Sequence, residues 1–314
     1  MKDAKQGQIP RRGYLYVVAA ALLWAVSGTS GKFLFHHGVT PYELVQLRVT
    51  LSAAVLFLWL AVRHRDLLRI SRRDLPYFLV LGIAGMAAVH FTYFFTISKI
   101  DVAIAILLEY LAPVFIALYS VLIVREKLTR TITASVALSF LGCYLAVGAY
   151  SIDILTLNWL GIAVGICAGI TYACYSILAE KGMRKYSPWT VVFYALLFAA
   201  LFWNIALRPL SSFIRPYSGV DWFWIVYISV LGTAVPFGLY TAGISLIRST
   251  RASVTATLEP IAAAFIAWLF LGEKLQIPQM LGGVLVIAAV ILLQVRCEYD
   301  ENTSALIRGR NNEW

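Results

Sequence analysis

Long apolar runs, separated by short polar connections, follow one another from residue 14 to residue 296 of this chain. An apolar α-helix of about 20 residues spans the roughly 30 Å hydrocarbon core of a bilayer. The pattern therefore predicts an all-α polytopic membrane protein with ten transmembrane helices. The predicted spans are residues 14–36, 42–62, 76–98, 102–123, 131–148, 157–179, 188–207, 222–246, 252–271 and 278–296.

The composition supports a membrane protein and excludes a water-soluble one. Of the 314 residues, 61% are apolar and 13% are charged, and the mean hydropathy is +0.79, whereas soluble domains carry roughly 25% charged residues. The net charge of +10 comes from basic residues in short loops, which argues against a nucleic-acid partner. The four cysteines lack metal-ligand spacing, and three lie in apolar runs, so we expect no metal, no cofactor and no disulfide framework.

The loops differ in their lysine and arginine content, which orients the chain in the cell membrane. If the N-terminus lies in the cytoplasm, twenty of the 26 lysines and arginines fall in cytoplasmic segments and four fall in segments on the opposite side. Loops rich in these residues stay on the cytoplasmic side. We therefore predict that both terminal segments, residues 1–13 and 297–314, are cytoplasmic.

The two halves of the chain repeat each other at an offset of 147 residues. The features that share this offset are Pro113 and Pro260, Tyr93 and Tyr240, Gly85 and Gly232, and the triplets Glu126-Lys127-Leu128 and Glu273-Lys274-Leu275. They predict a five-helix repeat over residues 14–148 and another over 157–296, joined by a linker at 149–156. Because five is odd, the second repeat enters the membrane from the opposite side, and such inverted repeats are typical of secondary carriers.

A doubled set of short motifs runs through the same region. They are Leu23-Trp24-Ala25, Thr40-Pro41 followed by Arg48, the prolines of spans four and nine, and the closing Arg125-Glu126-Lys127-Leu128 and Gly272-Glu273-Lys274-Leu275. With them the chain resembles the EamA-domain family of ten-span carriers in the drug/metabolite transporter superfamily. It departs from that pattern at Tyr172, which matches Trp24 in the second half, and at Arg125, where glycine is usual. The resemblance implies a carrier of amino acids, nucleotide derivatives, drugs or other metabolites.

Three prolines lie inside predicted spans, at Pro113, Pro236 and Pro260. A helical proline leaves the carbonyl four residues earlier without its donor. The carbonyls freed in this way belong to Glu109, Gly232 and Ala256. In a membrane such groups are tolerated where they meet neighbours or line a water-filled cavity. The prolines therefore indicate either the centre of the bundle or kinks that serve packing alone.

Glu109 and Glu259 are carboxylates within predicted spans, and they are not related by the repeat. Each lies seven residues into its span, which is about 10 Å deep at 1.5 Å per residue. Because the two spans run in opposite directions, we expect Glu109 in an outer vestibule and Glu259 in an inner one. An ionisable group at this depth is a functional candidate, here for substrate binding or proton exchange. The alternative is a structural carboxylate that is neutralised or paired.

Lys32, Glu43 and Arg48 are expected to form a polar group on the outer side of spans one and two. One interpretation is an ion pair that joins the two spans, with Lys32 reaching the interface. The other is that Arg48 or Lys32 binds a substrate carboxylate.

Aromatic residues and one histidine supply further candidates for a binding cavity. They are Trp24, His90, Tyr93, Tyr172, Tyr175 and Tyr240. Aromatic walls with a few polar tips are the usual composition of a small-molecule site. The competing interpretation is that Trp and Tyr lie at membrane interfaces and that the histidine is hydrogen-bonded in the core.

These features favour a secondary transporter that moves a small organic metabolite by alternating access. We expect an amino acid, a related compound or a drug as the solute, and efflux as the direction. No Walker motif is present to use ATP directly. A membrane-embedded transferase would need clustered His, Asp or Cys, and the four histidines form no such cluster, so we predict that the protein is not an enzyme. A uniporter or channel stays as an alternative. The expected partners are the solute and the lipid bilayer, with a coupling proton and an oligomer left open.

Overall fold

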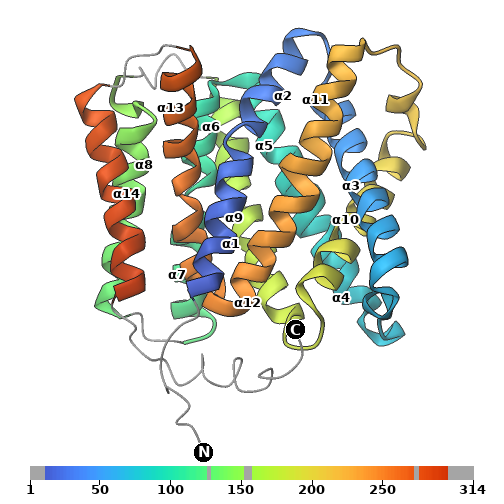
Figure 1. Ribbon diagram of the computed structural model, residues 1–314, viewed down its shortest axis with the longest axis horizontal. Coiled ribbons are helices and arrows are strands. Elements are labelled where there is room, and N and C mark those ends of the chain that lie inside the picture. Colours follow the sequence, from blue (N-terminus) through green and yellow to red (C-terminus); the bar gives the residue numbers. More distant parts are fainter. Residues whose placement is uncertain (1–10, 126–128, 152–157, 272–275, 296–314) are drawn as a thin grey trace, which may run out of the picture.

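The computed structural model describes residues 11–125, 129–151, 158–271 and 276–295, and in that part it contains helices and no strands (Figure 1). The helices are α1 (Arg11–Trp24), α2 (Ser27–His36), α3 (Pro41–Arg63), α4 (Leu75–Val80), α5 (Ala88–Lys99), α6 (Val102–Glu109), α7 (Ala112–Leu122), α8 (Arg130–Ala146), α9 (Trp159–Gly182), α10 (Pro188–Ala206), α11 (Gly219–Ser229), α12 (Val235–Ala256), α13 (Leu258–Leu271) and α14 (Ile277–Val295). The predicted all-helical class is confirmed. The repeated closing triplets at 126–128 and 273–275 lie outside the described residues.

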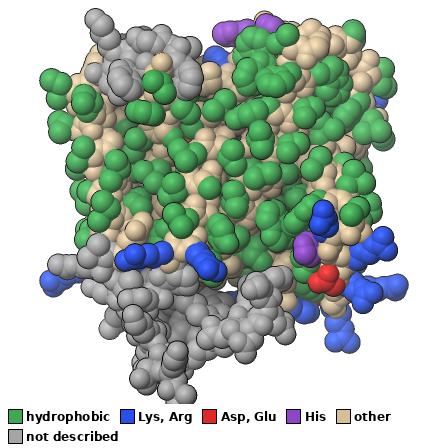
Figure 2. Space-filling model, in the orientation of Figure 1, with side chains coloured by type: hydrophobic (Ala, Val, Ile, Leu, Met, Phe, Trp, Pro, Cys, Tyr) green, Lys and Arg blue, Asp and Glu red, His purple; other side chains and the backbone are tan. Residues whose placement is uncertain are grey.

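Eight helical segments of the described chain are long and apolar enough to cross a membrane. Two further helices are shorter, α8 with 17 residues and α13 with 14. The face shown in Figure 2 carries a broad band of apolar side chains, while lysines and arginines gather along its lower edge. The molecule is therefore a polytopic membrane protein.

Local signals in the sequence explain where several helices begin. Thr40 caps α3: its side chain accepts a hydrogen bond from the Glu43 amide, and the Glu43 carboxylate accepts one from the Thr40 amide. Pro41 occupies the first turn, where a missing N–H costs nothing. At the start of α10, the Ser187 side chain accepts a hydrogen bond from the Thr190 amide, and Pro188 occupies the first turn. These caps satisfy amides that the first turn of a helix leaves free.

Several spans are interrupted. Span one breaks between α1 and α2 at residues 25–26, and span four breaks between α6 and α7 just before Pro113. Near the end of α12 the backbone of Arg248 has φ 69°, a region that favours glycine, so the helix bends there. The helical residues between this bend and Ala256 precede α13, which begins at Leu258, so the predicted ninth span at 252–271 takes in the end of α12 and all of α13.

Spans three and eight each contain a π-helical stretch, η3 (Leu81–Ala87) and η7 (Val230–Ala234). A π-helical turn holds one residue more than an α-helical turn and is frequent at functional sites. Gly85 lies in η3 and Gly232 in η7, the pair that shares the 147-residue offset. The two stretches therefore interrupt corresponding helices at corresponding positions.

Glycines set the closest helix contacts. α9 runs through the middle of the bundle and contacts α5, α6, α7 and α12. A Cβ on Gly169 of α9 would lie 2.8 Å from the carbonyl oxygen of Leu108, so only glycine allows this approach. α8 and α14 pack against each other at the left edge of the molecule in Figure 1. A Cβ on Gly282 of α14 would lie 2.6 Å from the carbonyl oxygen of Gly142 on α8.

Candidate functional site

A narrow cavity lies among the interrupted helices. It has about 30 Å³ of space that the centre of a water molecule can reach, which is room for about two waters. Eight helices and one break supply its lining residues, which are Trp24, Ser27, Arg48, Val89, His90, Tyr93, Glu109, Tyr110, Tyr172, Phe237 and Glu259. Six of the eight cavity residues predicted from the sequence are in this set, together with Arg48.

Helix breaks supply much of the lining. Trp24 ends α1 and Ser27 begins α2, so both flank the first break. Glu109 ends α6 and Tyr110 follows it in the second break. Glu259 lies in the first turn of α13. Irregular backbone at membrane depth is tolerated where it is buried in protein or faces a wet cavity, and these breaks meet that condition.

Arg48 crosses from α3 to η7. Its Nε and Nη2 atoms donate to Thr233 Oγ1 at 2.9 and 2.6 Å, and Nη2 also donates to the Gly232 carbonyl at 3.1 Å. That carbonyl is the one whose helical donor Pro236 removes. The guanidinium also lies 4.6 Å from the centre of the Phe94 ring. Arg48 therefore satisfies a proline-freed carbonyl and presents positive charge at the cavity.

Tyr110, from span four, likewise donates to a carbonyl that a proline has freed, in this case in span nine. Its hydroxyl lies 2.7 Å from the Ala256 carbonyl, which Pro260 deprives of a donor, and 2.8 Å from Glu259 Oε2. All three residues are buried. The Tyr110 hydroxyl, from the break between α6 and α7, thus contacts both the backbone at the junction between α12 and α13 and the Glu259 carboxyl group beside it.

Glu109 and Glu259 line the same cavity, so the expectation of two separate vestibules is wrong. Glu109 is the last residue of α6, and Glu259 lies in the first turn of α13, so each carboxyl group stands beside a helix break. Glu109 interacts electrostatically with both Glu259 and Arg48. The cavity therefore holds one cationic group and two carboxyl groups. No cluster of three or more His, Cys, Asp or Glu suited to a metal ion occurs among the described residues.

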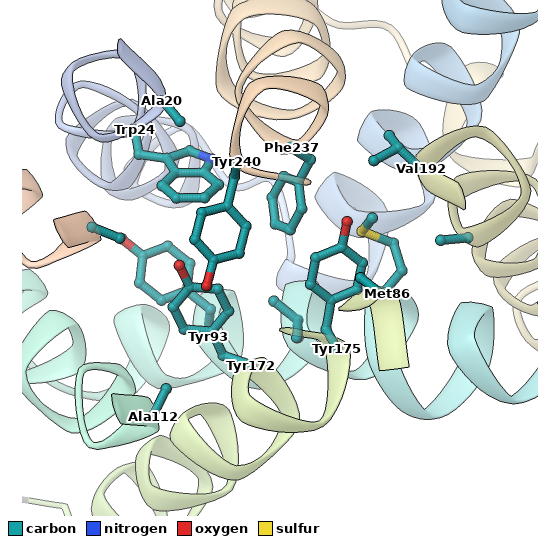
Figure 3. Packing of buried hydrophobic residues seen from close by; sticks show 14 of the residues in the cluster. Ala20, Trp24, Met86, Tyr93, Ala112, Tyr172, Tyr175, Val192, Phe237 and Tyr240 are labelled. Atoms are coloured by element: carbon teal, nitrogen blue, oxygen red, sulfur yellow. The ribbon is translucent and has the colours of Figure 1, made fainter. Parts of the chain in front are cut away.

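Aromatic rings also line the cavity, and Figure 3 shows Trp24, Tyr93, Tyr172 and Phe237 among the packed side chains. The Trp24 ring centre lies 5.1 Å from that of Phe237 and 6.3 Å from that of Tyr172. Tyr175 and Tyr240, also predicted for the cavity, do not line it. They lie one layer behind, fully buried, where their hydroxyls pair with Thr241 and Ser176 at 2.8 and 2.9 Å (in that order).

His90 and Tyr93 lie side by side on α5 and face the cavity. The His90 Nε2 atom and the Tyr93 hydroxyl are buried and have no hydrogen-bond partner within the part of the chain that the structure describes. Buried polar atoms are nearly always paired. These two are therefore suited to meet a water or a solute in the cavity.

The predicted outer group of Lys32, Glu43 and Arg48 is not a single group. Lys32 Nζ donates to the carbonyls of Ile97 and Ile100 at 2.8 and 3.2 Å, at the end of α5. Glu43 pairs with Arg215 at 2.7 Å instead of with Arg48. Glu43 and Arg48 are five residues apart, which turns their side chains away from each other on the helix, so only Arg48 reaches the cavity.

Four lining residues were not among the candidates from the sequence: Ser27, Val89, Tyr110 and Phe237. Two of them stand next to features that the sequence analysis had identified, since Tyr110 follows Glu109 and Phe237 follows Pro236. Adjacency in the sequence to a proline or carboxylate within a span is therefore the signal that points to these two residues. Ser27 and Val89 carry no such signal.

Comparison with known proteins agrees with this architecture. A sequence model of the EamA-like transporter family matches residues 11–148 and 159–295. An uncharacterized transporter of Archaeoglobus fulgidus is 30% identical over 283 residues, which is 88% of this chain and 96% of the relative. The uncharacterized inner membrane transporter YicL of Salmonella typhimurium is 26% identical, covering 91% and 96% of the two chains. The pseudopaline exporter CntI of Pseudomonas aeruginosa is 28% identical, covering 80% and 85%.

A crystal structure of a similar chain supports the fold. It superposes with a TM-score of 0.71 over 91% of this chain and 99% of the other, at 22% sequence identity. At that identity the likeness concerns the fold alone. The family match extends over nearly all of the described helices. The chain belongs to the EamA-like transporter family and is a multi-pass protein of the cell membrane.

Proposed function

We propose that this transporter is a secondary carrier that exports an amino acid or a related zwitterion by alternating access. The observation that carries the proposal is the cavity itself, where Arg48, Glu109 and Glu259 meet an aromatic wall. Arg48 suits a carboxylate of the solute, and the Glu109 carboxyl suits an ammonium group. Trp24 and Phe237 suit an apolar or aromatic side chain. The relative named as a pseudopaline exporter supports the outward direction.

Alternating access is supported by the position of the cavity at helix breaks. A space for about two waters is too small for an amino acid, so binding requires the surrounding helices to part. Breaks at residues 25–26 and 110–111 and the bend at Arg248 are places where helix halves can move separately. The matched π-helical stretches η3 and η7 support two repeats over residues 14–148 and 157–296.

The topology that we propose has ten spans with both termini in the cytoplasm. α8 supplies the fifth span, since 17 residues of α-helix reach about 25 Å, and α13 supplies the ninth together with the helical residues that follow the bend at Arg248. The gathering of lysines and arginines at the face where α1 begins supports the orientation (Figure 2). Cysteines placed at Gly38 and at Arg69, in a cysteine-free background, test it. A membrane-impermeant thiol reagent should label the Gly38 site from outside intact cells and the Arg69 site only in inverted vesicles; the reverse result contradicts the topology.

Counterflow in proteoliposomes tests the transport proposal. Vesicles loaded with one unlabelled amino acid should take up the same labelled amino acid transiently, which an enzyme or a simple channel does not produce. A panel of the common amino acids identifies the solute. Arg48→Gln and Glu109→Gln should each lower uptake at least tenfold, because each removes a charge from the cavity.

Glu43→Gln is the matched control, since Glu43 pairs with Arg215 away from the cavity. It should leave counterflow within about twofold of the unchanged protein, as loss of an exposed ion pair has small effects. Absence of counterflow for every amino acid would contradict the substrate class. Uptake that continues in Arg48→Gln and Glu109→Gln would contradict the assignment of the cavity.

A further inference from the structure

The Tyr110 hydroxyl has a single proton, yet its oxygen makes short contacts with two other oxygen atoms. Its oxygen lies 2.7 Å from the Ala256 carbonyl oxygen and 2.8 Å from Glu259 Oε2. Both distances are at the usual value for a full O–H···O hydrogen bond, and a second proton allows each contact to be one. A carbonyl cannot donate. If Tyr110 donates to Ala256, the second proton must be on Glu259, which donates to the tyrosine oxygen.

We propose that Tyr110 is a positioning residue that couples the protonation of Glu259 to the helix junction between α12 and α13. In the arrangement that we propose, a protonated Glu259 donates to Tyr110 Oη across the 2.8 Å contact, and Tyr110 donates to the Ala256 carbonyl across the 2.7 Å contact. Pro260 makes the junction depend on this donor, because Pro260 has no N–H to offer Ala256. The inference rests on the proposed carrier function for its role in transport, although its test does not.

Loss of the proton reverses the chain of donors. The O–H bond of Glu259 breaks, the proton passes to water or to a basic group of a solute in the cavity, and the electron pair stays on the carboxylate. A carboxylate is a stronger acceptor than a carbonyl, so the Tyr110 hydroxyl turns toward it. The Ala256 carbonyl, fully buried, is then left without a donor, and an unpaired buried carbonyl destabilises the junction that it belongs to.

Other ionisable groups also face Glu259 and set the conditions for this exchange. They are Glu109 on α6, Arg48 on α3, His90 and Tyr93 on α5, Tyr172 on α9 and Cys143 on α8. Glu109 shares the cavity without a bond to the α12–α13 junction. Its ionisation alters the charge in the cavity, whereas ionisation of Glu259 also removes a hydrogen bond. The two carboxyl groups therefore have different structural consequences.

Infrared spectroscopy of the purified protein in liposomes tests the protonation state. The spectrum should contain a protonated-carboxyl C=O band that disappears in Glu259→Gln, and in Tyr110→Phe this band should shift because the tyrosine acceptor is lost. Tyr93→Phe is the control, because its hydroxyl lines the cavity without contacting Glu259. A Glu259 that is already a carboxylate at neutral pH overturns the proposal.

Hydrogen–deuterium exchange of residues 249–262 tests the link to the junction. The exchange rate of the unchanged protein is compared with that of Glu259→Gln at the same pH. At a pH where the carboxyl band is lost, the unchanged protein should exchange about tenfold faster than Glu259→Gln, which is the factor expected for one hydrogen bond. Tyr110→Phe should be fast at every pH. Equal exchange in Tyr110→Phe and the unchanged protein at low pH overturns the coupling.

Pro260→Ala distinguishes this role from a general effect on packing. An alanine restores the N–H that a helix would offer to Ala256, so Tyr110→Phe should then change exchange by less than about twofold. A tenfold effect that persists in Pro260→Ala overturns the proposal. These readouts need no substrate, so a failed counterflow experiment and a failed coupling experiment are separate results.

Discussion

Arg48 shows how one side chain can serve structure and cavity together. It is 3% exposed, yet its charge is supported by a hydroxyl, a carbonyl and an aromatic face. Each of these partners lies on a helix other than α3. A planar guanidinium reaches them at once with two nitrogens, which a lysine ammonium cannot do. The geometry of the cavity therefore depends on the identity of this cation as well as on its charge.

Arg48→Lys should lower the free energy of unfolding by about 2 kcal/mol, because the Gly232 carbonyl and the Thr233 hydroxyl lose a charged donor. Chemical unfolding in mixed micelles measures the change. Arg215→Lys is the matched control at the exposed Glu43 pair and should cost less than about 1 kcal/mol. Equal effects of the two substitutions would show that Arg48 is held no more specifically than a surface arginine.

The residue chemistry was predictable only in part. The rule for prolines indicates that the carbonyls of Gly232 and Ala256 need donors, and the structure supplies Arg48 and Tyr110. The donors themselves could not be predicted, since they lie 184 and 146 residues away in the chain. Glu109 and Glu259 could be recognised in the sequence as carboxylates within spans, but their positions in the chain could not show that both face one cavity.

At the scale of helices, the α8–α14 pair depends on two facing glycines. A Cβ on Gly282 would lie 2.6 Å from the Gly142 carbonyl oxygen, whereas one on Gly283 would meet only Ile261 Cγ2 at 3.7 Å. Neighbouring residues on one helix thus have opposite tolerance for a methyl group. Helix lengths and starts were predictable because caps and prolines lie in the local sequence, as at Thr40 and Ser187. The π-helical stretches were not, because one additional residue hardly changes an apolar run.

Gly282→Ala should destabilise the protein by about 1–3 kcal/mol, since the added methyl forces α8 and α14 apart. Gly283→Ala should be neutral or stabilising by up to about 1 kcal/mol, because alanine favours a helix. Thermal unfolding of the two variants in detergent compares them directly. An equal loss in both would show that helix packing at this pair tolerates a methyl group.

At the scale of the whole molecule, a partly buried lysine links two spans near one membrane face, and a glutamate links two spans near the opposite face. Lys32, eight residues after Trp24, donates to the carbonyls that end α5. Glu180, eight residues after Tyr172, accepts from the Ser249 amide at 2.7 Å and from Arg248 Nε at 3.0 Å, where α12 resumes after its bend. A cation at a helix end and an anion at a helix start both complement the helix dipole. Each side chain ties two spans together at its own face.

Lys32→Met and Glu180→Gln should therefore bias the cavity toward opposite sides. With Ser27→Cys as a reporter in a cysteine-free background, Lys32→Met should raise labelling by an impermeant thiol reagent from the side where α2 ends, by about fivefold or more. Glu180→Gln should raise it from the other side. An increase from the same side in both variants would contradict this division of roles.

The π-helical stretches also affect comparison between chains. Each residue turns a helix by about 100°, and η3 and η7 each precede a helix half that faces the cavity, with His90 and Tyr93 after one and Phe237 after the other. A relative that lacks a single residue within 81–87 would keep both flanking helices but present different side chains to the solute. Among such chains, solute preference would follow the length of this segment more closely than overall sequence identity.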